Sequence, residues 1–383
     1  MSFRLIAECE NGSRAGSLTL PSGKVIETPA FMPVATKLSV KTLSPEDLVN
    51  IGVQMLITNG FLSHLEPGSE VIRNFGGMHE FVNWDGGIFS DSGGFQFIRR
   101  GFSPEISDGG VIMNSPFSGD RIRLSPEDVV DFHVKHGVDV GMVLDHCPPF
   151  PSQSDHLMDS SRRTVLWADR SMKRIGDRRL RESSPIGRDH LPMFYAITQG
   201  GCDVDLRKRC TEKLVDMDFP GYGIGGLSIG EDKETTFRML EVSTSYLPKG
   251  KPRYFMGVGQ PGDVIRSIGS GVDIFDSVFP TRNARHRSVF TLSGRENIRF
   301  GGWKGVNQPI VKGCDCEACL NYSRGFIYHM FKAGEQLGPR LATIHNLRFM
   351  RLLVKGSRRR IIEGNFKNND DPGGIVDECL RSS

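Results

Sequence analysis

Eight short apolar runs, separated by stretches with helical spacing, constrain the fold of this chain more than any other feature. Such runs are typical of strands that are buried on both faces of a parallel sheet. Eight of them alternating with helices predict an α/β fold, the closed (β/α)8 or TIM barrel. A doubly wound open sheet is the alternative, but no glycine-rich dinucleotide-binding turn follows the first run. The runs span residues 30–34, 53–58, 87–90, 140–144, 193–198, 222–227, 253–258 and 272–278.

Turn and capping signals predict the segments around the barrel. The first thirty residues hold alternating runs separated by Asn11-Gly12 and Ser22-Gly23, which indicates an N-terminal antiparallel β segment. Ser44 and Ser125 each precede Pro-Glu-Asp, as at the start of a helix. Residues 99–124 predict a further β excursion after the third strand.

These patterns divide the chain into three parts. Residues 1–280 contain the N-terminal β segment and the barrel strands. Residues 281–366, inserted after the eighth strand, contain a cysteine cluster and the closing helices. Residues 367–383 are polar and are predicted to be a disordered tail.

Cysteine usage and hydropathy predict the cellular compartment of the protein. No apolar run reaches the length of about 18 residues that a membrane span needs, and the N-terminus lacks the apolar stretch of a signal peptide. Three of the eight cysteines crowd into residues 314–319, too close to one another for a stable bridge. We therefore expect a cytoplasmic protein whose clustered cysteines bind a metal.

Acidic side chains stand where several of the runs end, which is the edge of a barrel that carries the chemistry. Asp91 and Asp145 follow the third and fourth runs, and Asp276 lies within the eighth. One such aspartate alone could cap a helix, but three at one barrel mouth favour a shared site. Asp276 stands in an apolar stretch, where an unpaired carboxylate costs several kcal/mol. We therefore expect the three aspartates to form the active site, with Asp276 as the nucleophile.

The neighbours of these aspartates suit a flat ligand. Ser92-Gly93-Gly94 removes side-chain bulk next to Asp91, and Gln199 ends the fifth run. The carboxylates would accept from N–H groups, while Gln199 and a backbone N–H would donate to a carbonyl oxygen. Those are the features of a pocket for a purine such as guanine.

The cysteine cluster has the spacing of a structural metal site. Cys314, Cys316 and Cys319 are followed 26 residues later by His345. Three thiolates and an imidazole fill the tetrahedral coordination sphere of zinc, so the ion would stabilise the fold and not activate water. His329 is a competing fourth ligand.

Residues 281–313 form a basic segment that carries seven basic side chains against one acid, Glu296. A run of charge is usually a solvated surface, but this one directly follows the Asp276 strand. Its position favours phosphate contacts and stacked bases, and Ser357-Arg-Arg-Arg360 adds a second basic patch. The segment includes Arg282, Arg285, Arg287 and Lys304, interleaved with Phe290, Phe300 and Trp303.

Five motifs now make a resemblance specific. The chain resembles the tRNA-guanine transglycosylase family, bacterial type, over about residues 3–366, with the motifs in the family's order. The resemblance implies exchange of the wobble guanine, in tRNAs whose anticodon begins G-U, for a 7-deazaguanine through a covalent bond between Asp276 and the ribose. The motifs are Phe89-Ser-Asp-Ser-Gly-Gly-Phe-Gln96, Gly225-Gly-Leu-Ser-Ile-Gly-Glu231, Met256-Gly-Val-Gly259, Phe275-Asp276 and Pro280-Thr-Arg282.

The resemblance also implies roles for the residues around the nucleophile. Asp91 would transfer protons and, with Asp145, hold the N–H edge of the base. Gln199 and the Gly226 N–H would hold its carbonyl oxygen. The other implied contacts are Phe95 and Met256, which would sandwich the ring, Cys147, Leu227 and Ile229 in the base pocket, and Arg282 and Arg285 on the anticodon loop.

The C-terminal part carries two further implications of the resemblance. Cys314, Cys316, Cys319 and His345 match the family's zinc site, with one structural ion per chain, which weakens His329 as a ligand. Tyr322, Phe326 and His329 resemble the aromatic patch through which family members form homodimers. Ordinary packing of a helix is the alternative for these three.

Some positions depart from the common bacterial pattern. His146 replaces a glutamate, Ser277 replaces a cysteine, and Asn59-Gly-Phe-Leu62 stands where Asn-Thr-Tyr-His is usual. These changes concern the detail of the base pocket. Ile229 is large where queuine-using members tend to have glycine, and Cys147 is retained, so the pocket is predicted to prefer preQ1 over queuine.

Three other functions compete with this prediction. A non-catalytic tRNA-binding partner subunit would have lost the nucleophile, whereas this chain keeps all three aspartates. A related enzyme that modifies DNA would use similar phosphate contacts, so the basic segment does not separate the two polymers. An unrelated barrel enzyme with a carboxylate pair would not need the cysteine spacing or the basic segment.

Overall fold

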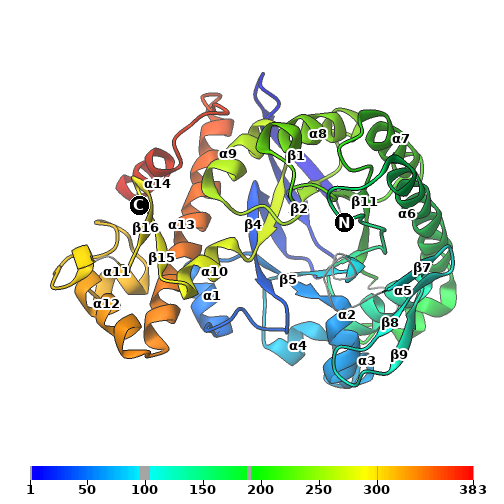
Figure 1. Ribbon diagram of the computed structural model, residues 1–383, viewed down its shortest axis with the longest axis horizontal. Helices are drawn as coiled ribbons and strands as arrows, with labels where there is room; N and C mark the ends of the chain where they lie inside the picture. Colours follow the sequence, from blue (N-terminus) through cyan, green and yellow to red (C-terminus); the bar gives the residue numbers. More distant parts are fainter. Residues whose placement is uncertain (1, 95–103, 188–190, 300, 383) are drawn as a thin grey trace.

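A closed parallel barrel forms the centre of the computed structural model, which describes residues 2–94, 104–187, 191–299 and 301–382. Each strand pairs with the next along the chain, and β14 pairs with β4 to close the barrel (Figure 1). The predicted (β/α)8 fold is confirmed, and each of the eight apolar runs overlaps one barrel strand. The strands are β4 (Ala30–Ala35), β5 (Met55–Asn59), β6 (Gly87–Asp91), β10 (Val140–Met142), β11 (Met193–Thr198), β12 (Gly221–Ile224), β13 (Arg253–Phe255) and β14 (Ile274–Ser277).

The barrel helices begin where the capping signals predict. Ser44 and Ser125 each accept from the backbone N–H three residues on, and Asp47 and Asp128 reach back to the cap N–H. The helices between strands are α1 (Pro45–Ile51), α2 (Gly60–Ser63), α3 (Ser69–Asn74), α4 (Met78–Val82), α5 (Pro126–His136), α6 (Ser154–Ile175), α7 (Val204–Val215), α8 (Lys233–Tyr246), α9 (Pro261–Gly269) and α10 (Phe279–Arg285).

Two small antiparallel sheets flank the barrel. The first is β1 (Ser2–Glu8), β2 (Arg14–Thr19) and β3 (Val25–Thr28), the predicted N-terminal segment. Its Leu18 and Ile26 pack with side chains of the barrel interior such as Tyr254, so this sheet covers the end opposite the carboxyl ends of the strands. The second is β7 (Glu105–Ser107), β8 (Gly110–Asn114) and β9 (Arg121–Leu124), the β excursion after β6.

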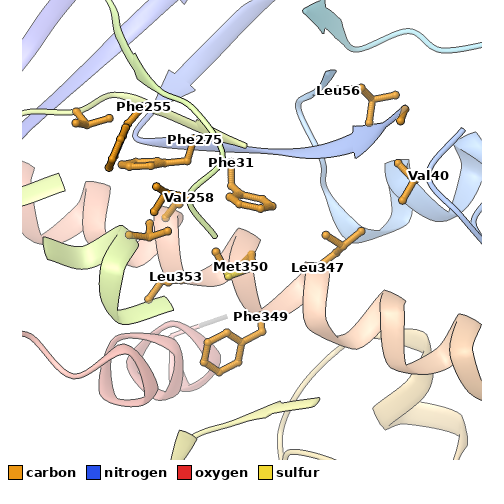
Figure 2. Packing of buried hydrophobic residues seen from close by; sticks show 14 of the residues in the cluster. Phe31, Val40, Leu56, Phe255, Val258, Phe275, Leu347, Phe349, Met350 and Leu353 are labelled. Carbon is orange, nitrogen blue, oxygen red and sulfur yellow. The ribbon is translucent and has the colours of Figure 1, made fainter. Parts of the chain in front are cut away.

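The segment after β14 builds a subdomain around a long helix. It contains β15 (Ser288–Thr291), β16 (Gly294–Asn297), α11 (Glu317–Asn321), α12 (Arg324–Ala333), α13 (Leu337–Ile362) and α14 (Pro372–Arg381). Figure 2 shows Leu347, Met350 and Leu353 of α13 beside barrel side chains that include Phe31 and Phe275. In Figure 1 the hairpin, α11 and α12 lie on the other side of α13 from the barrel.

The prediction of a disordered tail is wrong for residues 372–381, which form α14. Ile375, Val376 and Cys379 are buried and form one stripe of an otherwise polar helix, which packs against α13. The arginines that precede the tail hold its polar side, since Arg360 forms ion pairs with Asp370 and Glu378. Among the described residues, no helix combines the length and the apolar character that crossing a membrane requires.

Candidate active site and metal centre

Three aspartates lie at the carboxyl ends of the barrel strands. Asp91 is the last residue of β6, Asp145 follows β10, and Asp276 is in β14. Each is held by donors that come from neighbouring strands, so the closed sheet fixes their mutual positions. Gln199 directly follows β11 and joins the same group.

Asp276 is oriented by two donors to one of its oxygens. The Tyr254 hydroxyl donates to Oδ1 at 2.6 Å, and the Gly257 N–H donates to the same atom at 2.8 Å. Within the described part of the chain, Oδ2 accepts no hydrogen bond. Burial raises the pKa of Asp276, and the two donors oppose that shift. One oxygen of an oriented carboxylate is therefore available to a ligand.

Asp91 is the second carboxyl group of this centre. Asn59 Nδ2 donates to its Oδ2 at 3.1 Å, and the Gly93 N–H donates to Oδ1 at 3.0 Å. Burial raises the pKa of Asp91 to about 7, and the negative charge of Asp276 adds to the rise. Asp91 can therefore hold or release a proton near neutral pH.

The raised pKa of Asp91 makes the stability of the fold depend on pH. Between the ordinary value of 3.8 and the folded value of about 7, the folded state keeps a proton that the unfolded chain releases. The contribution of this group is complete below the unfolded pKa and is lost as the pH rises through the folded pKa. Fully developed, the loss is at most about 4 kcal/mol, at roughly 1.4 kcal/mol per pKa unit.

Asp91→Asn removes this titration, so the variant is expected to gain stability relative to wild type as the pH rises. Between about pH 5 and pH 8 the difference in the free energy of unfolding should move in the variant's favour by roughly 2 kcal/mol. Urea unfolding of both proteins at several pH values measures it. A difference that is the same at every pH would contradict the expectation.

Asp145 and Gln199 form a buried pair. Gln199 Nε2 donates to Asp145 Oδ2 at 2.7 Å, and Ser92 Oγ donates to Oδ1 at 3.4 Å. Burial raises the pKa of Asp145 to about 6, although both hydrogen bonds lower it. The Oε1 atom of Gln199 has no hydrogen-bond partner among the described residues. A buried amide oxygen without a partner is uncommon.

The Gly225–Gly226 turn lies against this pair. Gly226 has φ +67°, and a Cβ there would collide with Gln199 Oε1, so the position requires glycine. Cys147 is buried beside the same group: burial raises the pKa of its thiol, as does Asp145, while Gln199 and the Gly226 backbone lower it. A carboxylate, an amide, a thiol and a backbone N–H therefore lie together at the carboxyl ends of β10 to β12.

The other predicted base contacts are placed as follows. Leu227 is buried, and Ile229 and Met256 are half-buried beyond β12 and β13. Phe95 lies outside the described residues. His146 is buried beside Asp145, and its Nδ1 faces Arg163 Nη1 at 2.9 Å. Burial, and then the Arg163 charge, lower the pKa of His146 to about 4, so the ring is neutral and accepts this hydrogen bond.

The predicted cysteine cluster closes around a histidine. Cys314, Cys316 and Cys319 place their Sγ atoms 3.9, 3.6 and 3.3 Å from His345 Nδ1. All four ligand atoms lie within 4.8 Å of one another, and His329 is not part of this group. His345 Nε2 lies 2.7 Å from the Phe290 carbonyl oxygen, which requires a proton on Nε2 and leaves the Nδ1 lone pair facing the thiols. The donor set therefore fits a metal ion.

Ion pairs join the cysteine cluster to α13. Arg348 donates to Asp315 at 2.7 Å, and Arg340 binds both Glu317 and Asp47. Because α13 also packs on the barrel, the cluster connects the loop at residues 314–319 to the rest of the fold.

The basic segment agrees only in part with its prediction. Arg282 is exposed, Arg285 beside it is half-buried, and neither forms an ion pair with a carboxylate in the ranges that the structure covers. The prediction of stacking surfaces is wrong for Phe290 and Trp303, which are buried in the subdomain core. Phe300 lies outside the described residues.

The second predicted basic patch, residues 357–360, is not available to an external partner. Arg358 donates to the carbonyl oxygens of Gly16 and Thr28, and Arg359 and Arg360 pair with Glu378. These cations hold the N-terminal sheet and α14 in place. The prediction fails because spacing does not reveal that a long helix presents its arginines to distant segments.

Three aromatic and histidine side chains lie on and before α12. Tyr322 and Phe326 stack with their ring centroids 5.1 Å apart. Phe326 is 36% exposed and His329 is exposed, so they are not ordinary core residues.

Two donors at the carboxylates, Tyr254 and Asn59, were not predicted as such from the sequence. Alternation along β13 and β14 carries a signal for Tyr254, since it pairs with Ile274 and therefore faces the barrel interior below Asp276. Asn59 pairs with Asp91 across β5 and β6, but that register is not readable from one sequence.

Comparison with known proteins gives one family. The family model described as queuine tRNA-ribosyltransferase matches residues 9–371. A protein named queuine tRNA-ribosyltransferase from Thermoanaerobacter pseudethanolicus is 42% identical over 362 residues, which cover 94% of this chain and 93% of the relative. Proteins of the same name from Halothermothrix orenii and Thermus thermophilus are 42% and 41% identical, covering 95% of this chain and 94% and 91% of their own lengths.

Proposed function

This chain belongs to the queuine tRNA-ribosyltransferase family and is a tRNA-guanine transglycosylase, and on that premise we propose that Asp276 is its nucleophile. The observation that carries the proposal is the unequal use of the two Asp276 oxygens. Oδ1 accepts from Tyr254 and Gly257, whereas Oδ2 accepts from none of the described residues. Because hydrogen bonds fix the carboxylate at one oxygen, the other oxygen is already oriented toward the substrate, and little conformational entropy is lost when the reaction begins.

The exchange then takes two displacements. Asp276 Oδ2 forms a bond to the ribose C1′ while the bond from C1′ to N9 of guanine breaks, and the electron pair of that bond leaves with the base. Asp91, with a pKa of about 7, delivers a proton to the departing base and accepts one from N9 of the incoming 7-deazaguanine. Attack of that N9 on C1′ releases Asp276.

The pocket around Asp145 reads the base. Asp145 and Asp91 accept from its N–H edge, while the Gly226 N–H and the Gln199 N–H that is not bonded to Asp145 donate to its carbonyl oxygen. The convergence of these groups supports the assignment, because each is the complement of one edge of a guanine. By the family resemblance we assign Met256 and Phe95 as the side chains that sandwich the ring, and Phe95 lies outside the described residues. Further contacts come from Cys147, Leu227 and Ile229.

Labelled guanine and tRNA test the function directly. Wild-type protein should incorporate the label into tRNA and form an RNA–protein adduct that survives denaturation, and Asp276→Ala should do neither. Absence of exchange in wild type, or equal exchange in the variant, would refute the proposal. Duplex and single-stranded DNA of the same sequence test whether the enzyme uses the other polymer.

The incoming base is preQ1 in preference to queuine. Ile229 is half-buried in the segment after β12, and its N–H donates to Glu231 at 3.1 Å, which holds the backbone there. We infer that its side chain occupies the space into which the larger substituent of queuine would extend. In a competition assay preQ1 should be used about tenfold more efficiently, and Ile229→Gly should reduce that preference. Ile229→Val is the matched control and should keep it. Faster exchange with queuine in wild type would overturn this prediction.

The tRNA anticodon loop binds at Arg282 and Arg285. Both follow directly on the nucleophile strand, and their charges are not neutralised by carboxylates in the described ranges. The half-buried Arg285 beside Arg282 has a lowered pKa, because burial and its neighbour disfavour the charge, and a phosphate would relieve this repulsion.

The metal is one structural zinc ion per chain, held by Cys314, Cys316, Cys319 and His345. Three thiolates and an imidazole leave no open coordination position, so the ion supplies stability and no catalytic step.

The chain also forms a homodimer through Tyr322, Phe326 and His329, whose exposure on and before α12 supports an interface. Sedimentation of wild type and Phe326→Asp, which should be monomeric, measures the assembly.

A further inference from the structure

Arg207 on α7 is a buried cation that the reaction scheme above does not use. It is fully buried, and within the described ranges it forms no ion pair with a carboxylate. Its donors go to backbone oxygens and one hydroxyl. Nε and Nη2 donate to the Gly201 carbonyl at 3.0 and 2.9 Å, Nη2 also donates to the Gly225 carbonyl at 3.2 Å, and Nη1 donates to Ser243 Oγ at 3.3 Å.

A cation in such a place is costly to keep. Burial lowers the pKa of Arg207 to about 10, and the groups that counteract the shift are the Cys210, Cys202 and Cys147 thiols and Glu231. An apolar side chain could fill the same volume without the desolvation cost. The position of this charge therefore calls for an explanation beyond packing.

The explanation lies in the peptide unit that Arg207 contacts. The Gly225 carbonyl and the Gly226 N–H belong to one planar peptide group, and resonance couples its two ends. A charged donor on the carbonyl oxygen shifts electron density away from the nitrogen and makes the N–H a stronger donor. The same contact, together with those to Gly201, ties the loop after β11 to the turn after β12 and fixes the direction of that N–H.

We propose that Arg207 is a positioning residue that polarises and orients the Gly225–Gly226 peptide, so that the Gly226 N–H stabilises the negative charge of the departing base. The inference rests on the proposed function, in which this N–H binds the base's carbonyl oxygen. When the bond from C1′ to N9 breaks, the electron pair enters the purine ring and part of its charge reaches that oxygen. A donor strengthened in advance stabilises this charge more than it stabilises the neutral base.

Two variants separate charge from shape. Arg207→Gln keeps an amide donor but loses the charge, and Arg207→Lys keeps the charge but loses the forked geometry. The matched control is Arg253→Gln. Arg253 is also buried, has a pKa lowered to about 10 by burial, and donates to the carbonyls of Leu247 and Gly271, but it lies at the opposite end of β13 from the site.

Guanine exchange by Arg207→Gln should show kcat about tenfold lower with KM for tRNA nearly unchanged. Arg207→Lys should recover most of the loss, and Arg253→Gln should lower the unfolding temperature without this change in kcat. Equal kcat for the two Arg207 variants, or a loss that appears only in KM, would overturn the proposal while the wild-type exchange still stands. Absence of exchange in wild type would instead refute the proposed function.

A measurement on the wild-type protein tests whether the site stabilises an anionic base, even if the Arg207 variants do not fold. In 8-azaguanine a nitrogen replaces C8–H and makes the base more acidic, so it binds as an anion at a lower pH than guanine. Inhibition of exchange should be stronger with 8-azaguanine than with guanine as the pH rises through the acid dissociation of the analogue. Weaker inhibition by the anion would overturn the proposal.

Discussion

Asp276→Asn is expected to lower guanine exchange by roughly four orders of magnitude while leaving the protein at least as stable as wild type. The amide keeps an oxygen that can accept from Tyr254 and Gly257, so the local hydrogen bonds survive. It removes a carboxylate whose pKa is raised by burial, and therefore a charge that the folded state holds at a cost. An amide oxygen is too weak a nucleophile to attack C1′.

Single-turnover exchange and thermal unfolding measure the two halves of this expectation. The matched control is Asp273→Asn, on the same stretch of chain but at the opposite end of the barrel. Asp273 Oδ1 accepts from Arg14 at 2.9 Å, so its neutralisation breaks a buried ion pair and should lower the unfolding temperature while the chemistry continues. If Asp276→Asn kept more than about one per cent of the wild-type exchange rate, the assignment of Asp276 as the nucleophile would be contradicted, because loss of a nucleophile lowers the rate far more.

Much of the barrel could be predicted from the sequence, because strands that are buried on both faces consist almost entirely of apolar residues. Parallel barrel strands are short apolar runs, and the predicted run at 193–198 coincides with β11. The position of the three aspartates at the strand ends could be predicted for the complementary reason: a charge in or beside an apolar run is expensive, and Asp276 stands inside β14. The cluster of Cys314, Cys316, Cys319 and His345, which could hold a metal ion, could be predicted because the cysteine spacing is local, and only His345 comes from a distant part of the chain.

The predictions that were wrong concern residues whose environment is set by parts of the chain that are distant in sequence. The polarity of residues 367–383 suggested disorder, yet three buried side chains and the arginines of α13 are enough to order α14. Phe290 and Trp303 are adjacent to basic residues in sequence, but they face the subdomain core. Arg207 shows the same limit, since nothing in its local sequence says that its guanidinium reaches the turn after β12.

Loss of the metal is expected to have the second large effect, through stability. In Cys316→Ser, or after chelation, the loop at 314–319 loses its connection to His345 on α13. Chelation would leave three thiols and an imidazole packed together without the ion, and Cys316→Ser would leave two thiols, a hydroxyl and the imidazole. Because structural zinc sites contribute about 10 kcal/mol or more to small domains, loss of even part of this should lower stability by at least about 3 kcal/mol.

Loss of the metal should first unfold the segment around the cysteine cluster, before the barrel. In Figure 1, β15, β16, α11 and α12 lie on the far side of α13 from the barrel, whereas α13 itself packs on Phe31 and Phe275 (Figure 2), so the barrel can remain folded when these elements unfold. We expect proteolysis within 301–323 before the barrel unfolds, one zinc per chain by elemental analysis of wild type, and none in the variant. The control is Cys9→Ser, a half-buried cysteine outside the cluster, which should keep the metal. A metal-free protein with the unfolding temperature and protease resistance of wild type would show that the cluster does not hold the subdomain together.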